Sequence, residues 1–188
     1  MLTDSQQLLD ELLVLRFQLG DQAAFDELMR RWESRLLYYL RRLVPQEADA
    51  WDALQRTWLA AFRDVRHLKE PRALRAWLYR VARNQAASHC RKELGHRSRI
   101  DDEADPEQIA EFHWSPALDE AERVHAALKS LSLPHREVIT LYFLEQMPLD
   151  EIAQVTSTPL GTVKSRLHHA KRVLKDLLEK GEHEHGLF

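Results

Sequence analysis

Basic and hydroxyl-bearing side chains follow one another at helical spacing near the C-terminal end of the chain. The run Gly161-Thr-Val-Lys-Ser-Arg-Leu-His would place Val163 and Leu167 on one side of a helix and hydrogen-bond donors on the other. Donors on an exposed helix suit the oxygens of DNA phosphates and the edges of guanine in the major groove. The residues predicted to face outward are Thr162, Lys164, Ser165, Arg166, His169 and Lys171.

The chain around this run predicts a helix-turn-helix between about residues 131 and 180. A short first helix is expected to have Pro148 at its first position, with Asp150 and Glu151 near the positive end of its dipole. Pro159 and Gly161 then interrupt the helical pattern. The second helix repeats apolar residues at steps of three and four, and these are Val163, Leu167, Ala170, Leu174 and Leu177.

Three short motifs of this segment occur in an order that carries a family resemblance. Glu151-Ile-Ala, the run starting at Gly161, and Ala170-Lys-Arg together resemble the promoter-reading segment of extracytoplasmic-function (ECF) sigma factors, within the sigma-70 family of bacterial RNA polymerase. The resemblance implies that the six outward residues contact the promoter -35 element. His169 departs from the arginine common there, which predicts a weaker or pH-dependent contact. Ser157 replaces the glycine common in the turn, which predicts some strain if its backbone is left-handed.

A helix predicted over about 47–63 carries a second polar stripe. Asp52, Gln55, Arg56 and Leu59 lie on its outer side and resemble the sigma segment that grips the clamp helices of the polymerase large subunit. Trp51 departs from the acidic residue usual in the family, and Arg56 after the glutamine is a second departure. Taken alone, Asp52 and Gln55 are better explained as an ordinary solvated helix face.

The next helix, predicted to run from residue 73 to about 92, provides a third group of chemically useful residues. Its run Trp77-Leu-Tyr-Arg-Val-Ala-Arg-Asn resembles the sigma segment that melts and reads the promoter -10 element. Cations that hold phosphates, combined with aromatic faces for bases, suit a melted strand. The spacing of Trp77 with Leu74 and Val81 favours core packing over a wedge between bases. The polar loop before the helix is implied to form a pocket for a flipped base over about 65–72. The implied -10 set is Arg66, Lys69, Arg72, Arg75, Trp77, Arg80, Arg83 and Asn84.

Charge is distributed unevenly along the 188 residues. A formal net charge of -3 argues weakly against a nucleic-acid binder, yet the segment from Arg63 to Arg99 is strongly basic. The segment from Asp101 to Glu122 contains only acidic charges and little periodicity. We therefore predict an acidic flexible linker over residues 95–117. The resemblance implies that it threads toward the polymerase active-site cleft, while a solubilising tether explains its composition equally well.

Composition and periodicity predict an all-α chain with two small domains. Only 5 glycines interrupt a sequence rich in leucine, alanine, arginine and glutamate. Further helices are predicted over about 1–19, 22–43 and 119–131, with another starting at Ser132-Leu-Pro134. The first domain, residues 1–94, is expected to bind core polymerase and the -10 element. The second, residues 118–188, is expected to bind the -35 element and to end in a short tail.

Several other functions lack the residues that they require. There is no glycine-rich phosphate loop, nucleophile elbow or plausible carboxylate pair, so an enzyme is not expected. A single cysteine, Cys90, and poorly spaced histidines predict no metal site and no cofactor, and His183 and His185 are expected in a disordered end. Without a signal peptide or a membrane-spanning run, the expected location is the cytoplasm.

The function predicted from these features is transcription initiation. The chain is expected to bind RNA polymerase core and promoter DNA, and the resemblance implies an anti-sigma factor as a further candidate partner. A free-standing helix-turn-helix repressor or activator is the alternative, and it would be favoured by dimers on symmetric half-sites. A metal- or thiol-responsive sensor built on the same helices is a weaker third possibility.

Overall fold

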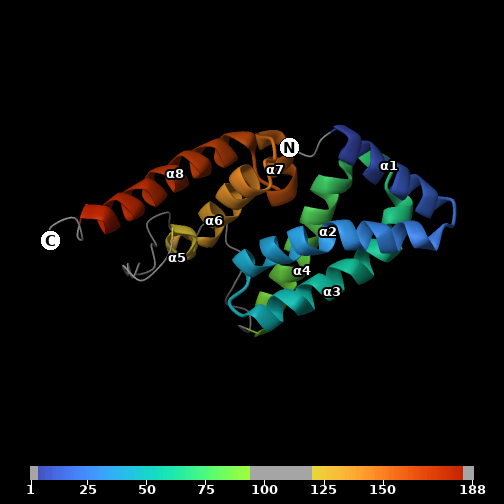
Figure 1. Ribbon diagram of the computed structural model, residues 1–188, viewed down its shortest axis with the longest axis horizontal. Helices are drawn as coiled ribbons and strands as arrows, with labels where there is room; N and C mark the ends of the chain where they lie inside the picture. The colour runs from blue at the N-terminus through green and yellow to red at the C-terminus, as the bar shows by residue number, and fades with distance from the viewer. Residues whose placement is uncertain (1–3, 94–119, 184–188) are drawn as a thin grey trace.

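The computed structural model describes residues 4–93 and 120–183, and within them every regular element is helical (Figure 1). The prediction of an all-α fold is therefore confirmed. The predicted linker over 95–117 lies outside the described residues. The first group of elements is α1 (Asp4–Gln18), α2 (Gln22–Leu43), α3 (Glu47–Asp64), η1 (Val65–His67), η2 (Pro71–Ala73) and α4 (Leu74–Glu93). The second group is α5 (Glu120–Ser130), α6 (Leu133–Ile139), η3 (Thr140–Leu144), α7 (Leu149–Thr156) and α8 (Leu160–His183).

Helix α2 forms the centre of the first group, and its boundaries match the prediction. Asp21 caps its start, since one carboxylate oxygen accepts a hydrogen bond from the Ala23 amide at 3.1 Å. The helix ends before Val44, whose extended backbone precedes Pro45. The buried face of α2 includes Leu28, Trp32, Leu36, Tyr39 and Leu40.

The predicted polar loop before α4 is instead two short 3-10 turns, η1 and η2. Val65 is buried, and its carbonyl accepts a hydrogen bond from the Leu68 amide at 3.1 Å, which closes the first turn. Pro71 begins the second turn, where its missing amide hydrogen costs nothing. Burial of one apolar side chain thus gave this segment a defined shape that a polar composition did not indicate.

Helix α1 is apolar on two opposite faces. Leu13, Val14 and Phe17 are buried, and the helix packs against α2. The Phe17 ring lies 5.0 Å from that of Phe25 and 5.4 Å from that of Phe62. Three leucines on the other face, Leu8, Leu12 and Leu15, are exposed, and so is Leu19 just after the helix.

A π-helical segment, η3, interrupts the second group and changes which side chains are buried. The Glu145 amide bonds to the Thr140 carbonyl at 3.2 Å, five residues back instead of four. The extra residue rotates the chain, so Leu144 is 45% exposed, while Met147 just beyond the segment is 1% exposed.

The helix-turn-helix consists of α7 and α8, and it differs from the prediction at Pro148, Gly161 and His183. Pro148 is the N-cap of α7 and not its first helical residue. Ser157 ends α7 with φ 55° and ψ 38°, the left-handed conformation anticipated for that position. Gly161 lies in the first turn of α8, because the helix already starts after Pro159. The same helix continues to His183, so this residue does not belong to a disordered end.

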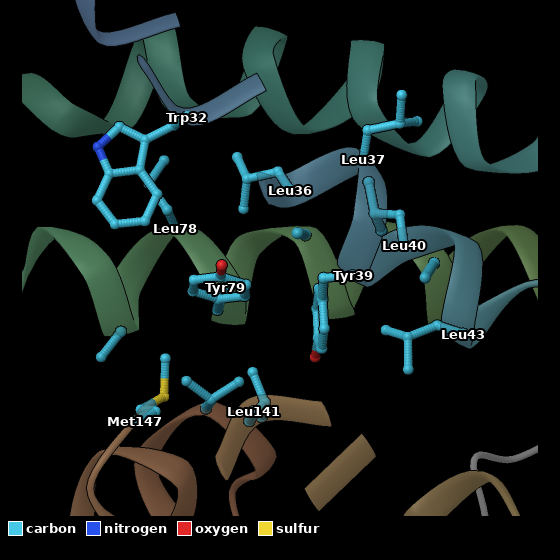
Figure 2. Packing of buried hydrophobic residues seen from close by; sticks show 14 of the residues in the cluster. Trp32, Leu36, Leu37, Tyr39, Leu40, Leu43, Leu78, Tyr79, Leu141 and Met147 are labelled. Atoms are coloured by element: carbon cyan, nitrogen blue, oxygen red, sulfur yellow. The ribbon is translucent and has the colours of Figure 1, made fainter. Parts of the chain in front are cut away.

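The two groups of helices share one hydrophobic core. In Figure 2, Tyr39 of α2 and Tyr79 of α4 lie between the leucines of the first group and Leu141 and Met147 of the second. All four side chains are 0–1% exposed. Helix α4 also packs directly against α7. The helix-turn-helix is therefore held against the surface that carries much of the predicted -10 set.

Candidate nucleic-acid interface

Helix α8 presents the centre of its predicted DNA-reading face to solvent. Lys164, Ser165 and Lys171 are exposed, while Thr162 and Arg166 are partly exposed. Val163, Leu167 and Ala170 on the opposite side are buried against the rest of the second group. The Ser165 hydroxyl donates to the Thr162 carbonyl at 3.0 Å, so in this state it bonds to its own helix.

His169 has a different position from the rest of this set, because its ring packs against α6. The ring centroids of His135 and His169 lie 4.8 Å apart. Nε2 of His169 is buried and has no hydrogen-bond partner among the residues described here. Burial, with the nearby His169 and Arg166, lowers the pKa of His135 to about 4, so that its ring is neutral at pH 7.

His168 is an exposed residue of α8 that the sequence analysis did not include. It follows Lys164 by four residues, and this helical spacing was the signal that could have found it. Lys171 also has intramolecular contacts, since its Nζ lies 4.8 Å from the centroid of the Tyr142 ring and 5.1 Å from that of Phe143.

The predicted -10 residues divide between solvent and the second group of helices. Arg66, Lys69, Arg72, Arg80 and Asn84 are exposed. Trp77 is partly buried and packs against the core, in agreement with its apolar spacing.

Arg83 is one of two cations of this set that face the second group. Its Nε donates to Glu137 Oε1 at 2.9 Å, and the Tyr39 hydroxyl donates to the same oxygen at 2.7 Å. The side chains of Arg83 and Glu137 are only 14% and 2% exposed. Burial and the Glu137 carboxylate raise the pKa of Tyr39 well above its ordinary value, so its hydroxyl remains protonated and donates. The Glu137 carboxylate is thus held by two donors from the first group.

Two further ion pairs join the groups of helices. Arg75, also a predicted -10 residue, lies 2.7 Å from the Glu151 carboxylate of α7. Arg35 of α2 lies 2.9 Å from Glu145, whose side chain is 5% exposed. Glu137 and Glu145 were not among the predicted site residues. Glu137 stands beside Val138 and Ile139 in an apolar segment, where a buried carboxylate needs a partner, and this was a signal in the sequence.

The polar stripe predicted on α3 is accessible. Asp52, Gln55 and Leu59 are exposed, and Leu59 reaches 69% exposure. Arg56 lies 3.8 Å from the Asp52 carboxylate, and this ion pair is accessible from solvent. Trp51, the residue that departs from the family pattern, is 41% exposed beside them.

Within residues 4–93 and 120–183, no three histidine, cysteine or acidic residues are grouped so that they could hold a metal ion. No helix within those ranges combines the length and the apolar character needed to cross a membrane. The side chains of His89, Cys90 and His183, and all of His185, lie outside what the structure describes.

An all-helical chain with an exposed helix-turn-helix and a basic surface beside it belongs to the class of DNA-binding transcription proteins. Two family models match it in order: sigma-70 region 2 over residues 28–94 and sigma-70 region 4 over residues 121–174. The RNA polymerase sigma-H factor of Pseudomonas aeruginosa is 31% identical, across 95% of this chain and 97% of that protein. The ECF RNA polymerase sigma-E factor of Escherichia coli is 30% identical, across 93% and 97%.

Two solved structures have the same fold. One is CnrH in complex with the cytosolic domain of CnrY, at 26% identity and a TM-score of 0.66, covering 92% of this chain and 98% of that chain. The other is the sigma factor RpoE in complex with the anti-sigma factor NepR from Bartonella quintana, also at 26% and 0.66, covering 82% and 96%.

The chain belongs to the ECF group of the sigma-70 family. It is a sigma factor that directs RNA polymerase to specific promoters for the initiation of transcription. Proteins of this family are generally non-enzymatic regulators. The comparisons give no support to a free-standing repressor or activator.

Proposed function

We propose that the first domain, residues 1–94, binds core polymerase through the exposed stripe of α3. Asp52, Gln55, Arg56 and Leu59 would dock on the clamp helices of the large subunit. Leu59 is the observation that carries this proposal, because a leucine with 69% exposure amid polar neighbours gains much from burial by a partner. Asp52 and Gln55 provide acceptors and a donor around it.

The same domain melts and reads the -10 element. Arg66, Lys69, Arg72, Arg80 and Asn84 are exposed and would hold the phosphates of the separated strand. Arg75 and Arg83 would join them after leaving Glu151 and Glu137. Trp77 would contribute from its partly buried position at the base of this surface.

The second domain, residues 118–188, reads the -35 element, and residues 95–117 link it to the first. Exposed Lys164, Ser165 and Lys171 would make the first contacts, together with Thr162 and Arg166. His169 would take part only if its ring left His135, which makes it the weakest member of the set.

The chain acts in the cytoplasm, without catalysis of its own and without a cofactor. An anti-sigma factor is a further partner that we propose, because a related fold is seen in the complex of RpoE with the anti-sigma factor NepR.

The test is reconstitution with bacterial core polymerase, measured by co-elution and by run-off transcription. Asp52→Ala/Gln55→Ala should reduce both, while Glu33→Ala/Ser34→Ala, on an exposed part of α2, should change neither. Unchanged co-elution of the first variant would overturn the assignment of the α3 stripe. Tight binding to duplex DNA without core polymerase, and no association with core, would contradict the proposed mode of action.

A further inference from the structure

Helix α1 makes contacts that core packing alone does not require. The match to sigma-70 region 2 begins at residue 28, so α1 lies before it. The helix nevertheless packs against both η1 and η2, the two turns that lead into α4. Two of its polar side chains, Glu11 and Gln18, contact the segment from Val65 to Ala73. This segment carries three residues of the proposed -10 set, Arg66, Lys69 and Arg72.

Gln18, the last residue of α1, joins the two ends of the first turn. Its side-chain Nε2 donates to the Val65 carbonyl at 3.2 Å and to the Leu68 carbonyl at 2.9 Å. The Val65 carbonyl also accepts the Leu68 amide at 3.1 Å, so the carboxamide adds to the backbone bond that closes the turn. A single side chain of α1 thus joins residues 65 and 68, across sequence distances of 47 and 50 residues.

Two more side chains of α1 secure the same segment at other points. The Arg66 guanidinium lies over the Phe17 ring at 4.9 Å. Glu11 lies 3.4 Å from Arg72, whose side chain is 77% exposed. Phe17 and Glu11 thus contact two of the three cations, while Gln18 fixes the backbone between them. Lys69 follows Leu68 directly, so its direction depends on the carbonyl that Gln18 holds.

We propose that Gln18 is a positioning residue for -10 recognition, because its carboxamide sets the shape of the turn that presents Arg66, Lys69 and Arg72 to the melted strand. This inference rests on the proposed role of that segment in binding the -10 element. Gln18 itself does not touch DNA. Without its two hydrogen bonds the turn would sample several shapes, and discrimination between bases would decrease more than binding of the polymerase.

The experiment compares base preferences, because a residue needed only for stability would not change them selectively. Full-length protein is combined with core polymerase and transcribes a promoter library randomised at both the -10 and the -35 elements. Gln18→Met keeps the size of the side chain and removes both donors. Its preference for the best over the second-best -10 base should decrease about threefold to tenfold, as expected for the loss of one or two neutral hydrogen bonds. Preference at the -35 element and co-elution with core should not change.

Matched variants separate positioning from folding. Gln22→Met makes the same substitution at an exposed glutamine of α2 and should leave both preferences intact. Gln18→Lys keeps N–H donors and should restore most of the -10 preference. If Gln18→Met does not fold, Gln18→Glu replaces it, since this side chain has the same size and no donor.

The outcomes also distinguish this inference from the function on which it rests. A Gln18→Met protein with a lower melting temperature and less transcription, but with unchanged -10 preference, would overturn the positioning role. An unaltered protein without any -10 preference would instead contradict the proposed function of the segment. A decrease of the preference at both elements would also overturn the inference, because Gln18 contacts only the turn proposed to bind the -10 element.

Discussion

The two proposed DNA-contacting surfaces differ in what their cations touch before DNA arrives. On α4, Arg75 and Arg83 pair with carboxylates of the second group of helices at 2.7 and 2.9 Å. On α8, Lys164 and Ser165 are exposed. Both surfaces carry basic side chains, but before DNA binds they differ in whether these side chains are paired with carboxylates. The -35 surface can meet phosphates directly, whereas part of the -10 surface must first exchange a carboxylate for a phosphate.

The difference has a physical consequence for the order of events. Every contact of Arg75 or Arg83 with DNA competes with a contact that joins the two domains. Binding at the -10 element and separation of the domains are thereby coupled, because each favours the other.

The largest effect is expected from Glu137→Ala, which removes the carboxylate shared by Tyr39 and Arg83. The free energy of unfolding should decrease by about 3–5 kcal/mol, since Arg83 loses its buried carboxylate and the buried Tyr39 hydroxyl loses its acceptor. Denaturation by guanidinium chloride measures this change. Glu179→Ala breaks the exposed pair with Lys175 and should have little effect. A Glu137→Ala protein as stable as the parent would show that Arg83 is not held by this carboxylate.

Lys164→Ala tests the surface that is already exposed. Loss of one good base or phosphate contact should weaken -35-dependent transcription by about 1–3 kcal/mol, or roughly fivefold to 150-fold. The unfolding free energy should remain the same, because Lys164 is exposed. Lys175→Ala, further along α8, is the control in the same run-off assay. Equal activity of the two variants would remove Lys164 from the reading face.

Acid should destabilise the packing of α6 against α8, which lies beneath the proposed -35 surface. The pKa of His135 is about 4 in the folded chain, below its ordinary value of 6.5. Between these two values the unfolded chain binds a proton that the folded chain does not. Stability should therefore be complete well above pH 6.5 and decrease as the pH falls toward 4, by about 2 kcal/mol at pH 5. His135→Phe should flatten this dependence in thermal unfolding between pH 7.5 and 5, and an unchanged slope would contradict the assignment.

The smallest effect is expected from Glu151→Gln. This change removes the carboxylate paired with Arg75, so the -10 surface comes to resemble the more exposed -35 surface. Arg75 would no longer need to leave a charged partner, so promoter opening should accelerate about twofold to fivefold, as the coupling of a partly buried pair allows. Permanganate reactivity of -10 thymines measures the opening rate. Asp150→Asn alters the neighbouring exposed carboxylate and should have no effect. The gain should disappear when Arg75→Ala is added, and a gain that persists would show another cause.

The fold could be predicted best where it depends on residues that are close together in the sequence. The limits of α2 and the exposed stripe of α3 follow from local periodicity and capping. The π-helical segment did not follow, because it depends on how Leu141 and Met147 fit against the first group. The same segment leaves Leu144 exposed and Met147 buried, which local apolar spacing does not indicate.

Site residues show the same limit. The types and spacing of residues on α8 predicted which side chains face outward. His169 is the exception, because its ring packs against His135 of another helix. The pairing of Tyr39 with Glu137 spans 98 residues, and no local pattern indicates it. The pairing of Arg83 with the same carboxylate therefore could not be predicted from the sequence.

The shared core also bears on how the chain loses its structure. Tyr39 and Tyr79 are covered by Leu141 and Met147, so unfolding of the second group would expose the first group's aromatic rings to water. Unfolding of the first group would in turn uncover these apolar side chains and the Glu137 carboxylate. Each half thereby depends on the other for its heat resistance, and the isolated chain should melt in one cooperative transition.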